Sequence, residues 1–268
     1  MRIARYRTSD GRIFAGLVEG DAVAPVAEES TAYMADAVRD LIASGADFSP
    51  AGPAVPLADV KLLSPVAHPE KIICIGLNYA DHIRETGLDT PSKVLAFVKT
   101  AHTLTGPYQD VVVPAGTTDQ LDWESELAVV MGPDGVFGYT VADDVSARDA
   151  QFADGQWFRG KNFDGFCPLG PWIVTADELA DPHGLAISAR VNGETVQDST
   201  TGEMIFKIPE IIAYLSTYMT LNPGDVIATG TPHGVGMGRR PPLWLKDGDV
   251  VECEVEGVGL LRNTVRIK

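Results

Sequence analysis

The chain has 268 residues, and its hydrophobic fraction of 45% is enough for one large domain, or for a small and a medium domain, with a buried core. Its net charge of −16 argues against nucleic acid as a partner, because nucleic-acid-binding proteins normally present a basic face. No segment is long and apolar enough to cross a bilayer, and the N-terminus has no apolar signal-peptide core. The three cysteines lack zinc-site or CxxC spacing, so the chain is expected to be cytoplasmic and to have no membrane partner.

Residues 1–65 predict a small N-terminal α+β domain, and residues 66–268 predict a larger domain that carries the chemistry. Short strands separated by turns are expected first, followed by a helix over residues 30–45 that ends at Gly45. The segment contains no cluster of catalytic residue types. We therefore expect the N-terminal domain to have a structural role.

The segment after this boundary predicts a buried strand over residues 71–77 and a short helix over residues 80–87. His82 and Glu85 are three residues apart, so they share a face of this helix and can form a hydrogen bond. A carboxylate that holds one imidazole nitrogen leaves the other free to take a proton from water. The alternative is a solvent-exposed turn in which the histidine and the glutamate are unrelated.

Two carboxylates interrupt an apolar strand pattern in the stretch Leu121–Met131. Residues two apart on a strand point to the same face, so Glu124 and Glu126 would project into one site. Buried like charges repel each other unless a hard divalent cation holds them together. The alternative is an edge strand with two solvated glutamates. Upstream, a strand over residues 94–99 ends at Lys99, which lies either at the surface or in a cleft.

A further strand over residues 138–141 runs into Asp143 and Asp144. One of these aspartates could supply a third carboxylate to the same site, and one could cap the helix that follows. Lys161 lies in a glycine-flanked, aromatic segment, which is an unusual setting for a surface lysine. This lysine is therefore a candidate for the site.

The C-terminal third predicts mostly strands. Strands over residues 186–191 and 195–198 are joined by Asn192-Gly193, which predicts a hairpin with a type I′ turn. A helix is expected over residues 206–221. Many strands and few helices, without βαβ repeats, indicate a β-roll or mixed-sandwich α+β fold.

A glycine-rich loop at residues 229–236 follows a predicted strand. It has neither the lysine of a Walker motif nor the spacing of a dinucleotide-binding loop. Its backbone N–H groups and the Thr231 hydroxyl could still hold a carboxylate. We therefore expect this loop to contact an anionic ligand.

Six stretches in this order resemble the fumarylacetoacetate hydrolase (FAH) family. They are IGLNYADHIRETG, DWESELAVVMG, GYTVADDVSARDAQ, RGKNFDGFCPLGPW, VNGETVQDSTTGEMIF and LNPGDVIATGTPHGVG. The N-terminal domain is similar to that of bacterial two-domain members. The resemblance implies an α+β fold, namely a mixed β-roll/β-sandwich catalytic domain with a small N-terminal domain, and a homodimer.

The resemblance also implies one divalent cation per subunit, Mg²⁺ or Mn²⁺, and assigns site residues by their place in the motifs. The implied metal ligands are Glu124, Glu126 and Asp144. The implied catalytic residues are His82, Glu85 and Lys161. The implied substrate contacts are Arg148, Gln151, Gly230 and Thr231. The chain departs from the family pattern at Asp143, where asparagine is usual.

The implied substrate is a small anionic 2-oxo acid. We interpret the chain as a metal-dependent hydrolase that cleaves a C–C bond in a 2,4-diketo acid, either an acylpyruvate or a 2,4-diketo-3-deoxy sugar acid, through a metal-bound enolate. An oxaloacetate decarboxylase, a 2-hydroxyhepta-2,4-diene-1,7-dioate-type isomerase, and a binding protein without catalysis are the alternatives. Local positive charge for the anion would come from the metal, Lys161 and Arg148, with Arg84 and Lys99 as further candidates. The helix that carries His82 is expected to act as a lid.

Overall fold

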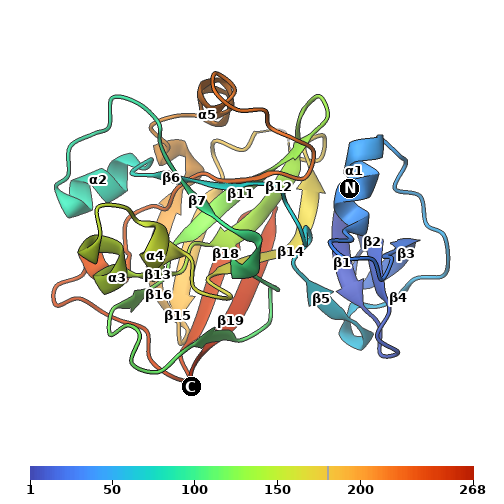
Figure 1. The fold of residues 1–268 in the computed structure, drawn as a ribbon, viewed down its shortest axis with the longest axis horizontal. Coiled ribbons are helices and arrows are strands. Elements are labelled where there is room, and N and C mark those ends of the chain that lie inside the picture. The colour runs from blue at the N-terminus through green and yellow to red at the C-terminus, as the bar shows by residue number, and fades with distance from the viewer. Residues whose placement is uncertain (180) are drawn as a thin grey trace.

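A twelve-stranded sheet organises the chain, in the order β4-β3-β2-β1-β14-β12-β11-β17-β6-β7, with β5 beside β1 and β8 beside β14 (Figure 1). The structure is a computed structural model, and it describes residues 1–179 and 181–268. The strands of this sheet are β1 (Arg2–Arg7), β2 (Ile13–Glu19), β3 (Ala22–Glu28), β4 (Val55–Pro56), β5 (Lys61–Leu63), β6 (Ile72–Gly76), β7 (Leu95–Lys99), β8 (Leu104–Thr105), β11 (Ser125–Gly132), β12 (Gly135–Asp143), β14 (Cys167–Thr175) and β17 (Val226–Ala228).

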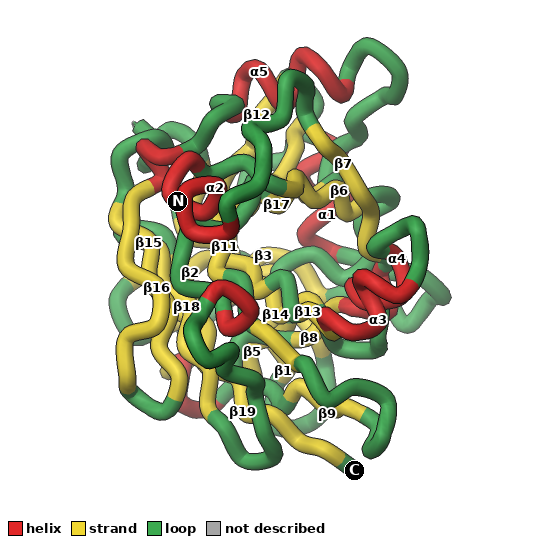
Figure 2. The backbone as a smooth tube through the Cα atoms, turned by 90° about the vertical axis from the view of Figure 1, so that its left-hand side faces the viewer, coloured by secondary structure: helices red, strands yellow, loops and turns green. Residues whose placement is uncertain are grey.

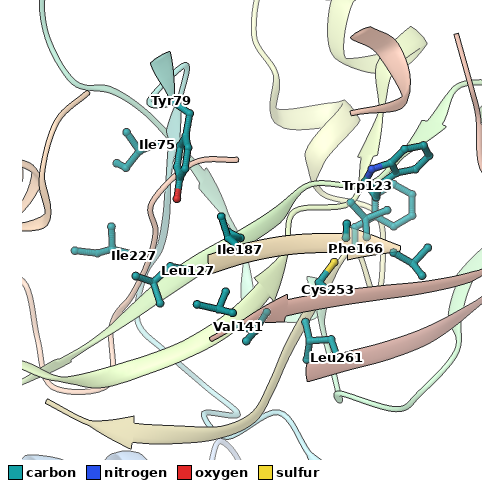
Figure 3. Packing of buried hydrophobic residues seen from close by; sticks show 14 of the residues in the cluster. Ile75, Tyr79, Trp123, Leu127, Val141, Phe166, Ile187, Ile227, Cys253 and Leu261 are labelled. Atoms are coloured by element: carbon teal, nitrogen blue, oxygen red, sulfur yellow. The ribbon is translucent and has the colours of Figure 1, made fainter. Parts of the chain in front are cut away.

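A five-stranded sheet, in the order β16-β15-β18-β19-β9, packs against the large one. Every second residue of β18 is buried, as expected for a strand with one face toward a core. Figure 3 shows Ile187, Cys253 and Leu261 of this sheet near Leu127 and Val141 of the large sheet. The strands are β9 (Val111–Val113), β15 (Ala186–Val191), β16 (Glu194–Thr200), β18 (Val250–Val255) and β19 (Gly259–Ile267), and a separate pair is formed by β10 (Leu121–Asp122) and β13 (Ser146–Ala147).

The helices are short and lie around the sheets. They are α1 (Ala37–Ser44), α2 (Ala80–Thr86), α3 (Arg148–Ala153), α4 (Phe158–Lys161) and α5 (Ile208–Leu215). Figure 1 shows α1 and the N-terminal strands at one end of the molecule and α2, α3 and α4 at the other. Figure 2 looks onto that other end, where α2 lies to one side and α3 and α4 to the other side. Within the described residues, no helix has the length and apolarity that a membrane crossing requires.

The N-terminal segment is joined to the rest of the chain by a continuous sheet. Strand β1 pairs with β14 in antiparallel register, with Ile3 opposite Ile173. Side chains of β1 and α1, among them Ile3 and Val38, share a core cluster with Val130 of β11. The two parts of the chain therefore share a sheet and part of a core. The boundary at residues 65 and 66 stays a prediction.

Several local predictions are confirmed by the structure. The apolar run in Leu121–Met131 becomes β11, which is buried along its whole length. The hairpin of β15 and β16 turns at Asn192 and Gly193, whose φ angles of 52° and 82° are those of a type I′ turn.

Two predicted helices are too long. Helix α1 begins only at Ala37, because Asp36 caps it by accepting a hydrogen bond from the Arg39 N–H. The helix predicted over residues 206–221 is helical only in α5, after which the chain continues as hydrogen-bonded turns.

The structure also excludes Asp143 and Asp144 as helix caps, because α3 begins at Arg148 after Ala147. Asp143 instead accepts a hydrogen bond from the backbone N–H of Glu124, 2.9 Å away. This contact ties the end of β12 to the residue before β11. The alternative role that the sequence left open for these aspartates is therefore wrong.

Candidate active site

Three carboxylates meet at the end of the β11–β12 pair. Glu124 precedes β11, Glu126 lies in it, and Asp144 follows β12. Because the two strands are antiparallel, with Ser125 opposite Asp143, the end of one strand lies beside the start of the other. Each carboxylate offers an oxygen atom, and these atoms lie within 4.8 Å of one another. All three side chains are buried, so the alternative of two solvated glutamates is wrong.

The chemistry of this carboxylate cluster fits a hard divalent cation. Three buried carboxylate oxygens at this separation are the kind of donor set that Mg²⁺ and Mn²⁺ prefer. Burial, together with the negative charges of Asp144 and Glu124, holds the pKa of Glu126 well above its ordinary value. A cation bound between the carboxylates would remove this repulsion.

Two buried lysines neutralise part of the negative charge. The Lys161 ammonium, at the end of α4, lies 2.8 Å from both Glu124 Oε2 and Asp144 Oδ2. Burial acts to raise the pKa of Glu124, but the positive charges of Lys161 and Arg148 outweigh it and lower this pKa to about 2. Lys99, at the end of β7, forms an ion pair with Asp144 and is fully buried, so its surface alternative is wrong.

Arg84, in contrast, does not supply positive charge to the cleft. Its side chain is 66% exposed, and its guanidinium pairs with Glu203 at 3.0 Å. Arg84 follows the buried positions Asp81, His82 and Ile83 of α2 and is exposed, as is Gly87 at the end of the helix. The prediction that Arg84 helps to hold an anionic substrate is therefore not supported.

Helix α3 brings Arg148 and Gln151 to the same place. Arg148 Nη2 lies 2.6 Å from Glu124 Oε1, and Arg148 Nη1 donates to Gln151 Oε1 at 3.0 Å. The carbonyl oxygen of Gln151 is therefore committed to Arg148, and its NH₂ group remains to donate to a ligand. Both side chains line the cleft described below.

His82 and Glu85 form a hydrogen-bonded pair on α2. His82 Nδ1 lies 3.3 Å from Glu85 Oε2, and Glu85 Oε1 accepts a hydrogen bond from the Gly234 N–H at 3.0 Å. His82 is only 6% exposed, so the alternative of a solvated turn is wrong. If Nδ1 carries the proton toward Glu85, Nε2 has a free lone pair and can act as a base.

The glycine-rich loop holds carboxylates of the protein itself. The Gly230 N–H donates to Glu126 Oε2 at 2.9 Å. The Thr231 hydroxyl donates to the carbonyl of Ser125 at 2.9 Å and accepts from the Gln197 amide. The donors that the sequence assigned to the substrate at these two positions are thus used within the protein, although Thr231 still lines the cleft.

A single cleft connects these groups. Seven of the predicted site residues line it, while Glu85, Asp144 and Gly230 lie directly behind the lining. Those seven are His82, Glu124, Glu126, Arg148, Gln151, Lys161 and Thr231. Its outer wall is apolar and includes Phe97 and Trp157, whose rings meet edge to face at 5.4 Å.

Sequence reasoning missed two buried polar residues of the site. Asp122 pairs with Arg148 at 2.8 Å, and Gln197 joins Ser125 to Thr231. The sequence does contain a signal for Asp122. Residues 122, 124 and 126 are all acidic and are spaced two apart, which is the spacing that places side chains on one face of a strand. No local pattern marks Gln197, whose partners come from distant segments.

Comparison with known proteins gives two family matches and close structural relatives. Residues 71–266 match the family described as fumarylacetoacetate (FAA) hydrolase C-terminal, and residues 1–65 match Rv2993c-like, N-terminal. The chain is 49% identical over 225 residues to the mitochondrial oxaloacetate tautomerase Fahd2a of Rattus norvegicus, which covers 80% of this chain and 72% of the relative.

Solved structures confirm the predicted fold class. A fumarylacetoacetate hydrolase from Exiguobacterium antarcticum is 38% identical, with a TM-score of 0.89 over 100% of both chains. A 2-hydroxyhepta-2,4-diene-1,7-dioate isomerase from Mycobacterium marinum is 35% identical, with a TM-score of 0.80 over 100% of this chain and 99% of that chain. These relatives catalyse different reactions on one scaffold.

Proposed function

This chain belongs to the fumarylacetoacetate hydrolase family, whose members act on keto acids, and we propose that it hydrolyses a C–C bond in a small 2,4-diketo acid. The substrate class would be an acylpyruvate or a 2,4-diketo-3-deoxy sugar acid. One observation carries the proposal: a single cleft contains a buried carboxylate cluster, the Lys161 ammonium and the imidazole of the His82–Glu85 pair. Together they suit the binding of an anionic 2-oxo group beside a base.

In this proposal, Glu124, Glu126 and Asp144 would hold one Mg²⁺ or Mn²⁺ per subunit. When bound, the cation would offset negative charge that develops on the keto oxygen of the substrate. The Lys161 ammonium, which lies between two of these carboxylates, adds a second positive charge at the same end of the cleft. The NH₂ group of Gln151 can donate to the substrate carboxylate.

The His82–Glu85 pair supports hydrolysis. His82 Nε2 would take a proton from a water molecule while Glu85 holds Nδ1. The water oxygen then forms a bond to the distal carbonyl carbon, and the bond between that carbon and C3 breaks. The electron pair of the broken bond remains on the pyruvyl part as its enolate, and the proton returns from His82 to C3. The products are a carboxylic acid and pyruvate.

A second candidate is keto–enol tautomerisation of a 2-oxo acid such as oxaloacetate. The specific observation in its favour is the 49% identity to an oxaloacetate tautomerase. The same imidazole would then take a proton from C3 of the keto form and return it to the oxygen on C2, which gives the enol, and no water would be consumed. The carboxylate cluster and Lys161 serve both reactions equally, so the two candidates differ only in what His82 deprotonates.

A small substrate panel tests the proposal. Acetylpyruvate, a 2,4-diketo-3-deoxy sugar acid and oxaloacetate are incubated with the protein and Mg²⁺ or Mn²⁺, with an EDTA control. Cleavage of a diketo acid that EDTA abolishes and that His82→Ala and Glu85→Gln strongly reduce supports the hydrolase. Interconversion of oxaloacetate tautomers with intact diketo acids supports the tautomerase, and release of CO₂ from oxaloacetate supports a decarboxylase. Oxalate binding without any turnover would instead indicate a binding protein.

We extend the proposal to the organisation of the protein. Matches of separate families to residues 1–65 and 71–266 support a small N-terminal domain and a catalytic domain. The family resemblance supports a homodimer, which sedimentation equilibrium tests by a mass twice that of the 28.6 kDa chain. Three free, buried cysteines support a cytoplasmic location, which cell fractionation tests.

A further inference from the structure

Asp122 is a fully buried carboxylate behind the cleft, and all of its partners are N–H donors. Its Oδ1 accepts hydrogen bonds from the backbone N–H groups of Trp123 at 2.9 Å and Gly236 at 2.6 Å. Its Oδ2 accepts from the Met237 N–H at 3.0 Å and from Arg148 Nε at 2.8 Å. The carboxylate is therefore shared between the glycine-rich loop and the guanidinium that lines the cleft.

The contact with Arg148 determines where that guanidinium points. A guanidinium is a planar fork, so a partner held at Nε defines the directions of both terminal nitrogens. In this structure one terminal nitrogen meets Glu124 and the other meets Gln151. The orientation of the Gln151 amide, which lines the cleft, thus depends on Asp122 through Arg148.

The loop can approach Asp122 so closely only because residue 236 is glycine. A Cβ atom at Gly236 would lie 2.7 Å from Asp122 Oδ1 and 2.0 Å from the carbonyl oxygen of Leu243. The same loop donates from Gly230 to Glu126 and from Gly234 to Glu85. Backbone N–H groups of one loop therefore hold three carboxylates that serve different parts of the site.

We propose that Asp122 is a positioning residue, which anchors Arg148 to the glycine-rich loop and thereby aligns Arg148 and Gln151 for the carboxylate of the substrate. This inference rests on the proposed function, because it assumes that a 2-oxo acid binds in the cleft. A buried ion pair contributes little net stability compared with well-packed apolar residues. The position of the Asp122–Arg148 pair beside the cleft is therefore better explained by its effect on side-chain orientation than by a contribution to stability.

The test is the substitution Asp122→Asn, with oxalate as the probe. In either orientation of the asparagine amide, its NH₂ group would face two N–H donors, because each oxygen of Asp122 accepts two hydrogen bonds. We expect the affinity for oxalate in the presence of Mn²⁺ to fall roughly 10-fold, as for other residues that orient a ligand-binding side chain. The affinity for Mn²⁺ alone should change much less, and KM should rise more than kcat falls. Isothermal titration and steady-state kinetics measure these quantities.

A double-mutant cycle with Arg148→Gln separates positioning from a purely structural role. If Asp122 acts through Arg148, Asp122→Asn should add almost nothing to the loss of oxalate affinity in the Arg148→Gln background. In the metal-free protein, Asp122→Asn should also shift the ¹⁵N resonance of Arg148 Nε. Asp122→Glu keeps the charge but moves it, and it provides the same measurements if the asparagine variant does not fold.

Asp225→Asn is the matched control. Asp225 is equally buried, accepts backbone hydrogen bonds from Lys71 and Asn222 and pairs with the Lys71 ammonium, but neither of these partners lines the cleft. The Asp225→Asn substitution should lower the unfolding temperature of the protein without changing its affinity for oxalate. The same pattern for Asp122→Asn, or additive losses in the cycle, would overturn the positioning role while the proposed function stands. A wild-type protein that neither binds oxalate with Mn²⁺ nor turns over any 2-oxo acid would overturn both.

Discussion

The floor and the rim of the cleft are built in different ways. The cleft floor is formed by Glu124, Glu126 and Lys161, with Asp144 directly behind them; these residues are at most 7% exposed, and the carboxylates lie where two central strands of the large sheet meet. The rim helix is α2, seven residues long and followed by exposed residues. A helix of this length is not stable by itself in water, so its position depends on tertiary contacts.

Ile83 is the buried apolar residue of this helix, and polar contacts tie the helix to its neighbours. Asp81 pairs with His233 at 2.9 Å and Glu85 accepts the N–H of Gly234, so two carboxylates of the rim helix hold it to the glycine-rich loop. The proposed cation ligands and the proposed base therefore lie on different kinds of structure. The residues proposed to hold a cation lie at the ends of buried strands of the large sheet, whereas the proposed base lies on a short helix that we expect to move to admit a substrate and then cover it.

The largest effect is expected at the floor. Glu126→Gln removes one oxygen ligand and should abolish measurable Mn²⁺ binding and turnover, as EDTA should in the wild-type protein. Because burial and the repulsion of neighbouring carboxylates raise the pKa of Glu126, the metal-free variant should unfold at a temperature no lower than the wild type. Titration calorimetry and thermal unfolding check this, with Glu194→Gln at an exposed position as control. Full Mn²⁺ affinity in Glu126→Gln would contradict the metal site.

Loss of the proposed base, His82 on the rim helix, should lower turnover without weakening Mn²⁺ binding at the floor. His82→Ala should lower kcat by about 10²- to 10⁴-fold, the range typical of lost general acid–base catalysis. Mn²⁺ and oxalate affinities should remain close to those of the wild type. His102→Ala, at a half-exposed histidine outside the cleft, is the control. Equal losses of kcat and of Mn²⁺ affinity would mean that rim and floor are not separate.

Replacing Lys161 tests whether the buried carboxylates of the floor need a positively charged side chain between them. Lys161→Met leaves Glu124 and Asp144 without the ammonium between them and should destabilise the metal-free protein by about 3 kcal/mol, as when one partner of a buried ion pair is removed. Mn²⁺ should restore part of this loss. Chemical denaturation with and without Mn²⁺ measures it, and the exposed Lys93 provides a control as Lys93→Met. A variant as stable as the wild type without metal would argue against this role of Lys161.

The smallest effect concerns the mobility of the rim helix. Hydrogen exchange over residues 80–90 should be faster than over β11 and should slow when Mn²⁺ and oxalate bind. Gly87 ends α2 with a φ of 70°, so Gly87→Ala should cost about 1 kcal/mol and speed exchange in α2 alone. Exchange at residues 80–90 that is equally slow with and without oxalate would contradict the lid.

Much of the floor follows from local patterns in the sequence. The period of a strand is enough to place Glu124 and Glu126 on one face, and the apolar residues after them predict that the strand is buried. The Asn192-Gly193 turn is equally local, since both residues tolerate the positive φ that a type I′ turn requires. The motif order predicted the family and its fold, because many weak signals in one order are specific together.

Other features depend on contacts between segments that are distant along the chain. Asp36, which sets the start of α1, also accepts hydrogen bonds from the backbone N–H groups of Ala67 and His68. The Gly230 and Thr231 donors bind Glu126 and Ser125 more than a hundred residues away rather than a ligand. A local pattern records which groups a residue can offer, and only the folded chain determines which partner accepts them.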